Sequence, residues 1–242
     1  MMPRLIPRGA GCLLLVLAAC AAQAAEPPKS VADALAVIRD PKAPRPDREA
    51  AVRFFRDHPK DGLQALPQLI DIYRQPRRDI NHCFYDVRAA LNALGPDGVG
   101  PQTDALADDK AADSLIHALW AYCWYTNPKE GPQLVARALG HKDASVRARA
   151  ADVLRQLKER AAATVPELTR ALEDPVPEVR AASAGAIEAV GPQAVAAVPS
   201  LISRLDDKSD EAAWAAAKAL GAMGEEALAP AIHALKTGSG AV

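Results

Sequence analysis

Four side chains have the atoms that a zinc ion would bind. His82, Cys83, His117 and Cys123 offer the imidazole nitrogens and thiolates that zinc prefers. Their spacing does not follow the close Cys-x-x-Cys or His-x-x-x-His pattern of a compact zinc site. We therefore expect no metal site in this chain.

The sequence also lacks the short motifs that position catalytic groups. It has no G-x-S-x-G, no H-E-x-x-H, no P-loop and no dinucleotide-binding fingerprint. The carboxylates of Asp206, Asp207 and Asp210 lie in a turn before a helix, where acidic side chains are ordinary helix caps. These observations predict a protein that is not an enzyme, with no catalytic residues and no bound cofactor.

Aromatic side chains are the remaining candidates for binding. All of them except Trp214 lie between positions 54 and 125, and they are densest at Trp120, Tyr122, Trp124 and Tyr125. One interpretation is that they fill the core of this part of the chain. The other is a patch that binds a partner, because Trp and Tyr are enriched at the energetic centres of interfaces. These four residues cannot all face one side of a helix.

A repeat of 33 residues indicates which elements position these side chains. Leu139, Leu172 and Leu205 are separated by this period, and so are Leu154, Ile187 and Leu220. Within one unit the apolar positions fall on one helical face, and in the best example they are Val146, Ala150, Val153, Leu154 and Leu157. The period therefore predicts stacked helical units.

Each unit is predicted to contain two helices. Pro166 and Pro199 mark the starts of first helices, and Gly191-Pro192 marks the end of a second helix. The N-terminal half keeps this punctuation at Gly95-Pro96. The predicted fold is all-α, an α-solenoid of about six antiparallel helix pairs with a closing C-terminal helix. The pairs are expected at about 30–59, 62–95, 98–126, 131–159, 163–191 and 195–224, and the closing helix at 225–236.

The repeated pattern resembles HEAT repeats, and in particular the short form named after phycobilisome-lyase-like proteins. Its best match is Leu172, Asp174, Val179, Arg180, Ala186, Ile187, Gly191 and Pro192. His141 stands in the aspartate position of the preceding unit. The resemblance implies a structural ladder, in which a repeat arginine bonds to the turn aspartate of the same or the next unit. The ladder residues would be Arg147, Asp174, Arg180 and Asp207.

The register of this repeat bears on the two central cysteines, Cys83 and Cys123. Cys83 falls near the start of one second helix and Cys123 near the end of the next, and the two helices run parallel. An axial offset of about 12 residues separates them by roughly 18 Å. A disulfide needs Cα atoms within about 7 Å, so two buried thiols are favoured over a bond.

The composition excludes several classes of protein. Half of the residues are hydrophobic, only 4% are aromatic and alanine is abundant, which favours closely packed helices over sheets or disorder. The 29 basic and 30 acidic residues lack the basic excess of a nucleic-acid-binding protein. We expect no nucleic-acid partner.

The N-terminal segment is predicted to direct export. Arg4 and Arg8 precede the apolar run 12–19, and small residues follow, as in a bacterial secretory signal peptide. Cleavage after Ala24 would leave a soluble periplasmic protein and a signal peptide at 1–24. The segment 17–20 instead resembles a lipobox, which implies a signal peptide at 1–19 and lipidation of Cys20. The expected location is the periplasm, or the outer membrane as a lipoprotein that faces the periplasm and contacts the membrane only through its lipid anchor.

These expectations give a division of the chain and a function. Residues 25–29 would form a short tether, 30–236 the solenoid and 237–242 a loose tail. We predict a non-catalytic scaffold or adaptor in the bacterial cell envelope that binds a protein or peptide on the surface of the second helices. The candidate contact residues there are Arg149, Asp152, Gln156 and Glu188. The alternatives are a lyase-like protein that acts on a tetrapyrrole-carrying partner and an accessory lipoprotein subunit of an envelope complex.

Overall fold

A computed structural model describes residues 27–75 and 84–237 of the chain. Every element within these ranges is helical. The signal peptide, the lipidation site at Cys20, the tether residues 25 and 26, the tail from 238 onward, and both His82 and Cys83 lie outside the described residues.

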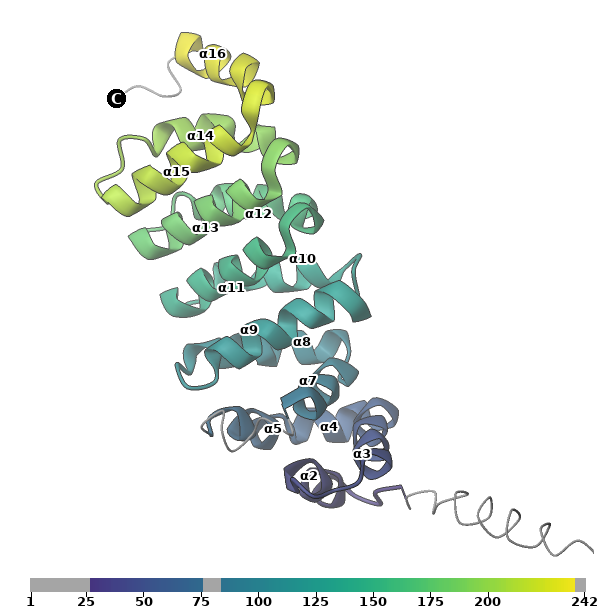
Figure 1. Cartoon of the computed structure of the whole chain (residues 1–242). Helices are drawn as coiled ribbons and strands as arrows, with labels where there is room; N and C mark the ends of the chain where they lie inside the picture. The colour runs from purple at the N-terminus through teal and green to yellow at the C-terminus, as the bar shows by residue number, and fades with distance from the viewer. Residues whose placement is uncertain (1–26, 76–83, 238–242) are drawn as a thin grey trace, which may run out of the picture.

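The helices of the described residues form six pairs followed by a closing helix, which confirms the predicted fold (Figure 1). The first helices, several of them extended by a short 3-10 segment, are α2 (Val31–Arg39), α4 and α5 (Pro59–Gln64 and Leu66–Tyr73), α8 and η1 (Pro96–Asp104 and Ala105–Ala107), α10 and η3 (Gly131–Ala136 and Arg137–Gly140), η4 and α12 (Lys158–Thr164 and Val165–Ala171), and η5 and α14 (Gly191–Ala197 and Val198–Ser203). The second helices are α3 (Arg45–Asp57), α7 (Phe84–Ala93), α9 with η2 (Ala112–Ala121 and Tyr122–Thr126), α11 (Ala144–Leu157), α13 (Pro177–Val190) and α15 (Asp210–Ala222). The chain closes with η6 (Gly224–Ala227) and α16 (Leu228–Thr237).

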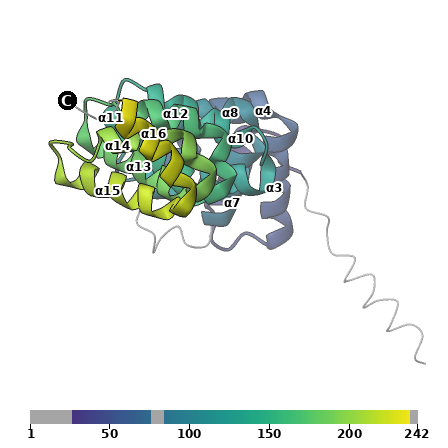
Figure 2. The ribbon, with the colours of Figure 1, turned by 90° about the horizontal axis from the view of Figure 1, so that it is seen from above.

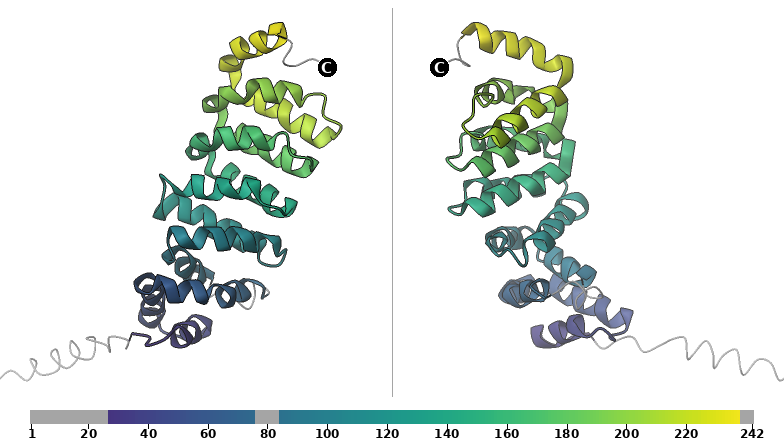
Figure 3. Two further views of the ribbon diagram at one scale, coloured as in Figure 1. Left: turned by 180° about the vertical axis from the view of Figure 1, so that it is seen from behind. Right: turned by 60° about the vertical axis from the view of Figure 1, so that its left-hand side comes forward.

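The second helices stack on one another in chain order, and so do the first helices, giving two layers (Figures 1 and 3). Helix α13 packs along both α11 and α15. Seen from above the stack, α3 runs across the direction of α15, so the helices turn between the two ends (Figure 2). The layer of second helices offers one continuous face, called here the second-helix face.

The core lies between the layers and is built from the repeat positions. The five residues that mark the apolar face of α11 are fully buried, and so is Ile187 at the equivalent position of α13. The repeat leucines Leu139 and Leu172 are buried at 8% and 0% exposure, but Leu205 is 43% exposed. Leu205 belongs to the last complete pair, which only the closing segment follows, and this explains its exposure.

The helices begin and end where the prolines and glycines of the sequence predict. Pro166 and Pro199 lie in the first turns of α12 and α14. Gly191 ends α13 with φ 70° and ψ −140°, a conformation that side chains disfavour. Lys158 ends α11 in the same conformation, with φ 54° and ψ −134°, one repeat earlier. The turn geometry is therefore fixed by the repeat even where glycine is absent.

One apolar stretch, Pro177–Ser203, is long and apolar enough to cross a membrane by length and composition alone. In the structure it is not one straight helix, because the chain changes direction at Gly191 between α13 and η5. Its buried side chains, such as Ile187 and Leu201, belong to the solenoid core.

Candidate interaction surface

The predicted ladder residues lie together in pairs that join successive units. Arg147 donates from Nε to Asp174 Oδ2 at 2.6 Å and from Nη2 to Oδ1 at 2.8 Å. Arg180 binds Asp207 in the same two-pronged way, at 2.7 and 2.6 Å. In both pairs the acceptor belongs to the turn of the next unit. Such a fork-to-carboxylate geometry is among the stronger polar contacts in proteins.

Each ladder arginine also holds the turn of its own unit. The Nη1 group of Arg147 donates to the carbonyl of His141 at 2.9 Å, and that of Arg180 to the carbonyl of Asp174 at 2.8 Å. Asp174 in turn accepts the backbone N–H of Val176 at 2.9 Å. The arginines are mostly buried, with 12% of each side chain exposed. Their hydrogen bonds are thus used within the chain.

The ladder shifts the acidity of its carboxylates. The hydrogen bond from Arg180 is the main cause that lowers the pKa of Asp207 below its ordinary value, against the opposing effect of burial. For Asp174 burial is the largest influence and raises the pKa, but the hydrogen bonds from Arg147 and from the backbone outweigh it. Both carboxylates are therefore charged at neutral pH.

The N-terminal half contains related contacts that the sequence analysis missed. Arg48 donates from Nη1 to the carbonyl of Ala43 at 2.6 Å, five residues earlier, as Arg180 does to Pro175. Its Nε lies 2.9 Å from Asp86 in the next second helix. Arg48 precedes Ala51, Phe54 and Phe55 at the spacing with which Arg147 precedes Ala150, Val153 and Leu154. This shared spacing is the sequence feature from which the role of Arg48 could have been predicted.

The aspartate position of the turn keeps a hydrogen-bond acceptor even where histidine replaces aspartate. His141 Nδ1 accepts the N–H of Asp143 at 3.0 Å, as Asp207 Oδ1 accepts that of Ser209 at 3.0 Å. Asp108, one period earlier, accepts the N–H of Lys110 at 3.0 Å and pairs with Arg74. An acceptor at this position therefore closes the turn before each of these second helices.

The aromatic segment divides between core and surface. Tyr122 is buried, and its hydroxyl accepts a hydrogen bond from Asn127 at 3.3 Å. Trp120 and Trp124 are half-buried and stack with ring centroids 5.7 Å apart, and Tyr125 meets Trp120 edge-on at 5.9 Å. Tyr122 is therefore a core residue, and partner binding by Trp120, Trp124 and Tyr125 stays a prediction.

A local change of helix type places the three outer rings together. Residues 122–126 form a π-helical turn, in which the N–H of Asn127 bonds to the carbonyl of Tyr122. The wider turn brings residues four and five positions apart onto one side. Tyr125 is 69% exposed there and lines a hollow of about 590 Å³ together with Arg53, Arg56 and Arg88.

The four candidate contact residues of the second-helix face differ in their surroundings. Arg149 donates to the carbonyl of Leu106 and to Asp109, so its guanidinium is fastened to the preceding unit. Asp152, Gln156 and Glu188 line hollows on the second-helix face. Asp152 pairs with Arg155 at 2.9 Å, and Glu188 pairs with Lys218 at 3.1 Å.

The largest exposed aromatic side chain of the C-terminal half lies on the same face. Trp214 of α15 is 69% exposed. It lines a hollow of about 440 Å³, called here the Trp214 hollow. The other lining residues come from three successive second helices: Ala148, Asp152, Arg155, Glu178, Ala181, Ala182, Gly185, Glu188, Glu211, Ala215 and Lys218.

Comparison with protein-family models agrees with this architecture. Two overlapping segments, 131–213 and 165–242, match the family model for HEAT repeats. Together these segments cover residues 131–242, so the likeness to HEAT repeats lies in the C-terminal part of the chain. A crystal structure of an engineered protein, 18% identical, aligns over 86% of this chain and 87% of its own with a TM-score of 0.46. A second engineered protein, 16% identical, aligns over 86% and 68% with a TM-score of 0.46. A search of curated proteins finds no match.

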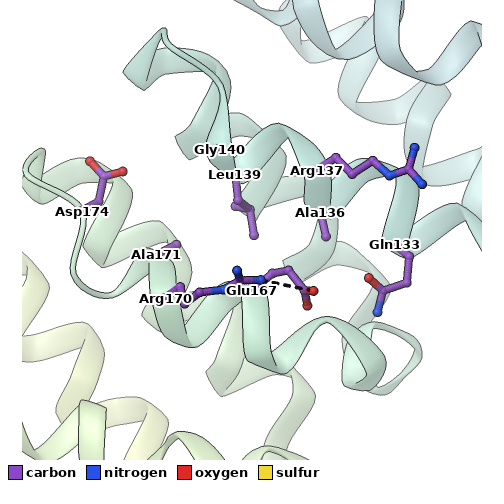
Figure 4. A pocket seen from close by; sticks show the side chains of 9 residues that line it. All are labelled: Gln133, Ala136, Arg137, Leu139, Gly140, Glu167, Arg170, Ala171 and Asp174. Atoms are coloured by element: carbon purple, nitrogen blue, oxygen red, sulfur yellow. Dashed lines mark ion pairs between the residues drawn. The ribbon is translucent and has the colours of Figure 1, made fainter.

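The first-helix layer of the HEAT repeats also has a hollow, of about 520 Å³, between α10 and α12 (Figure 4). Glu167 and Arg170, one turn apart on α12, form an ion pair at 3.5 Å on one side of it. Arg137 and Asp174 point away from this pair. The charged groups therefore do not converge on one point, as a site for chemistry would require.

Of the four residues weighed as zinc ligands, two lie in the described part of the chain. Cys123 is a free, buried thiol, and burial raises its pKa to about 12. His117 is exposed on α9. Within residues 27–75 and 84–237 no group of three or more His, Cys, Asp or Glu side chains could hold a metal ion. Whether Cys83 pairs with another cysteine concerns a residue outside these ranges.

Proposed function

We propose that this protein is a non-catalytic scaffold or adaptor that binds another protein along its second-helix face. HEAT-repeat arrays usually act through an extended surface and not through a reactive site, because each unit contributes one strip of that surface. The observation that carries the proposal is the exposure of Tyr125 and Trp214 in two hollows of this face. Large aromatic side chains left exposed beside hollows are typical of interface centres.

Site-specific crosslinking tests this proposal. A photoreactive amino acid would replace Gln156 on the second-helix face or, as the matched control, Arg170 on the first-helix layer. In the cells that make the protein, we expect a discrete protein adduct from position 156 and none from position 170. Equal adducts from both positions would contradict the proposal. The absence of any adduct from position 156 and from other exposed positions of α11 and α13 would also contradict it.

We further propose that the scaffold works in the bacterial cell envelope. The support is the pattern of residues 1–25, with its basic start, short apolar run and small residues. The lipobox-like segment that ends at Cys20 favours a lipid anchor, since several acyl chains bind a membrane stably.

Metabolic labelling with a palmitate analogue tests the anchor. We expect label on the unaltered protein and none on Cys20→Ser. Equal labelling of the two proteins would remove the lipoprotein assignment, and recovery of both from the cytoplasmic fraction would remove export as well.

A further inference from the structure

Trp214 departs from the repeat at an exposed position. The equivalent residues one and two periods earlier are Ala181 and Ala148. Small residues therefore satisfy the packing of the stack at this position, and 69% of the Trp214 side chain remains exposed. A mostly exposed tryptophan that the packing of the stack does not need points to contact with something outside the chain.

The charges around the Trp214 hollow do not cancel. Asp152 pairs with Arg155, and Glu188 pairs with Lys218 at 3.1 Å. The two remaining carboxylates, Glu178 and Glu211, are exposed and form no ion pair within the described part of the chain. They occupy equivalent repeat positions on α13 and α15. Because these helices pack side by side, the hollow has a negative edge that matches a positively charged partner.

Two other aromatic rings of this protein, those of Trp124 and Tyr85, each have an arginine guanidinium group over one face. Arg160 places its guanidinium carbon 3.7 Å from the ring centre of Trp124, and Arg88 lies 5.0 Å from that of Tyr85. Among the described residues, no cation lies over Trp214. The nearest candidate in sequence, Lys218 one turn later, is held by Glu188. The face of the Trp214 ring is thus free for a cation from elsewhere.

We propose that the Trp214 hollow binds a lysine- or arginine-bearing segment of a partner protein, with the cationic group against the Trp214 ring and Glu178 and Glu211 as its counter-charges. The lining includes Ala181, Ala182 and Gly185, and residues this small leave room for a long side chain. This inference rests on the proposed scaffold function and names the chemistry of the segment that one part of the second-helix face recognises.

Nuclear magnetic resonance of the tryptophan indole groups tests the proposal directly. The full chain has three tryptophans, and the Trp214 signal is identified by its loss in Trp214→Phe. The probe is a short peptide of alternating arginine and serine, compared with one of alternating glutamate and serine. We expect the arginine peptide to shift the Trp214 signal saturably, and the signals of Trp120 and Trp124 to stay in place. The glutamate peptide should leave all three unchanged.

Variants then assign the interaction to the proposed groups. Trp214→Ala should weaken peptide binding about 3- to 30-fold, the range expected for loss of a cation–π contact, and Trp214→Phe should weaken it less. Glu211→Gln should weaken binding and reduce its dependence on salt. Glu130→Gln, an exposed carboxylate at the start of α10, is the matched control and should have no effect. Because alanine occupies the equivalent positions, the circular dichroism spectrum of Trp214→Ala should be unchanged.

Two results would overturn the proposal. One is equal binding of the arginine and glutamate peptides, and the other is an unchanged dissociation constant for Trp214→Ala. Either result, together with a protein adduct from position 156, would leave the scaffold function standing with a different partner chemistry. Failure of the crosslinking as well would remove both.

Discussion

At the scale of single residues, the stability of the stack depends on a few polar side chains placed between units. Arg147 and Arg180 each connect the turn of their own unit to the carboxylate of the next. Asp207 is the most enclosed of the partners, with 2% of its side chain exposed. Removing Arg180 leaves this buried carboxylate with only the longer contact to Arg204 at 3.5 Å, which costs more than the pair itself contributes.

Arg180→Ala is therefore expected to lower the free energy of unfolding by about 2–3 kcal/mol at pH 7. The folded state lowers the pKa of Asp207, so this contribution is complete above the ordinary aspartate pKa of about 4 and declines as pH falls toward the lower folded value. The difference between the two proteins should therefore shrink at pH 3. Urea unfolding at both pH values measures it.

The control for this experiment is Arg170→Ala. Arg170 is 76% exposed and lies 3.5 Å from Glu167, so its loss should change the unfolding free energy by no more than about 0.5 kcal/mol. An equal loss of stability in the two variants would show that the buried ladder has no special role.

Lys158 is a second residue whose effect can be predicted. It has φ 54° where the equivalent residues of the next two units are Gly191 and Gly224, with φ 70° and 63°. Lys158→Gly should raise the unfolding free energy by about 1 kcal/mol, because glycine adopts this conformation without strain. Thermal unfolding should shift upward by about 2–4 °C. Lys158→Ala keeps the Cβ atom and should give no such gain.

At the scale of elements, each helix is defined by one apolar face and held by its neighbours. No single pair buries its apolar face alone, because the facing surface belongs to the next unit. Helix α13 illustrates this dependence, since it packs against α11 on one side and α15 on the other. Ile187 of α13 is fully buried.

Ile187→Asp is expected to unfold the adjoining units together. A buried carboxylate without a partner is costly, so we expect a loss of several kcal/mol and a lower or biphasic thermal transition. Circular dichroism at increasing temperature measures it, with Glu188→Gln on the exposed side of the same helix as the control. An unchanged transition would mean that the register of the repeat is wrong.

At the scale of the whole molecule, stability should decrease from the centre of the stack toward its ends. A central unit has a neighbour on each side, whereas the closing helix α16 has one. Leu228 and Ile232 of α16 are 60% and 51% exposed, and Leu205 is exposed in the last pair. In a stacked array, the free energy of local opening follows the number of such interfaces.

Hydrogen exchange can test this gradient. Amides of α16 should exchange faster than those of α11 and α13, and low concentrations of urea should widen the difference. The core alanines of α11 and α13 should open only with global unfolding. Uniform protection along the chain would instead indicate a single cooperative unit.

The sequence predicted well those features that depend on local pattern. Leu172, Val179 and Ile187 recur with the period, and their burial follows from the helical spacing of apolar side chains. Pro166 and Gly191 likewise fix the ends of helices through their own backbone restrictions. The candidate contact residues stay a prediction, and the structure adds that Arg149 is bound to Asp109 while Asp152 and Gln156 line a hollow.

What the sequence determined by itself is the repeat: its period, its helix pairs and the punctuation between them, because each depends on residues close together in the chain. Only the tertiary structure decided which side chains meet across units. The π-helical turn at 122–126 groups Trp120, Trp124 and Tyr125, and the stacking of α13 on α15 sets Glu178 and Glu211 beside Trp214. These contacts depend on how each helix is rotated relative to its neighbours in the stack. The repeat pattern of the sequence does not specify that rotation.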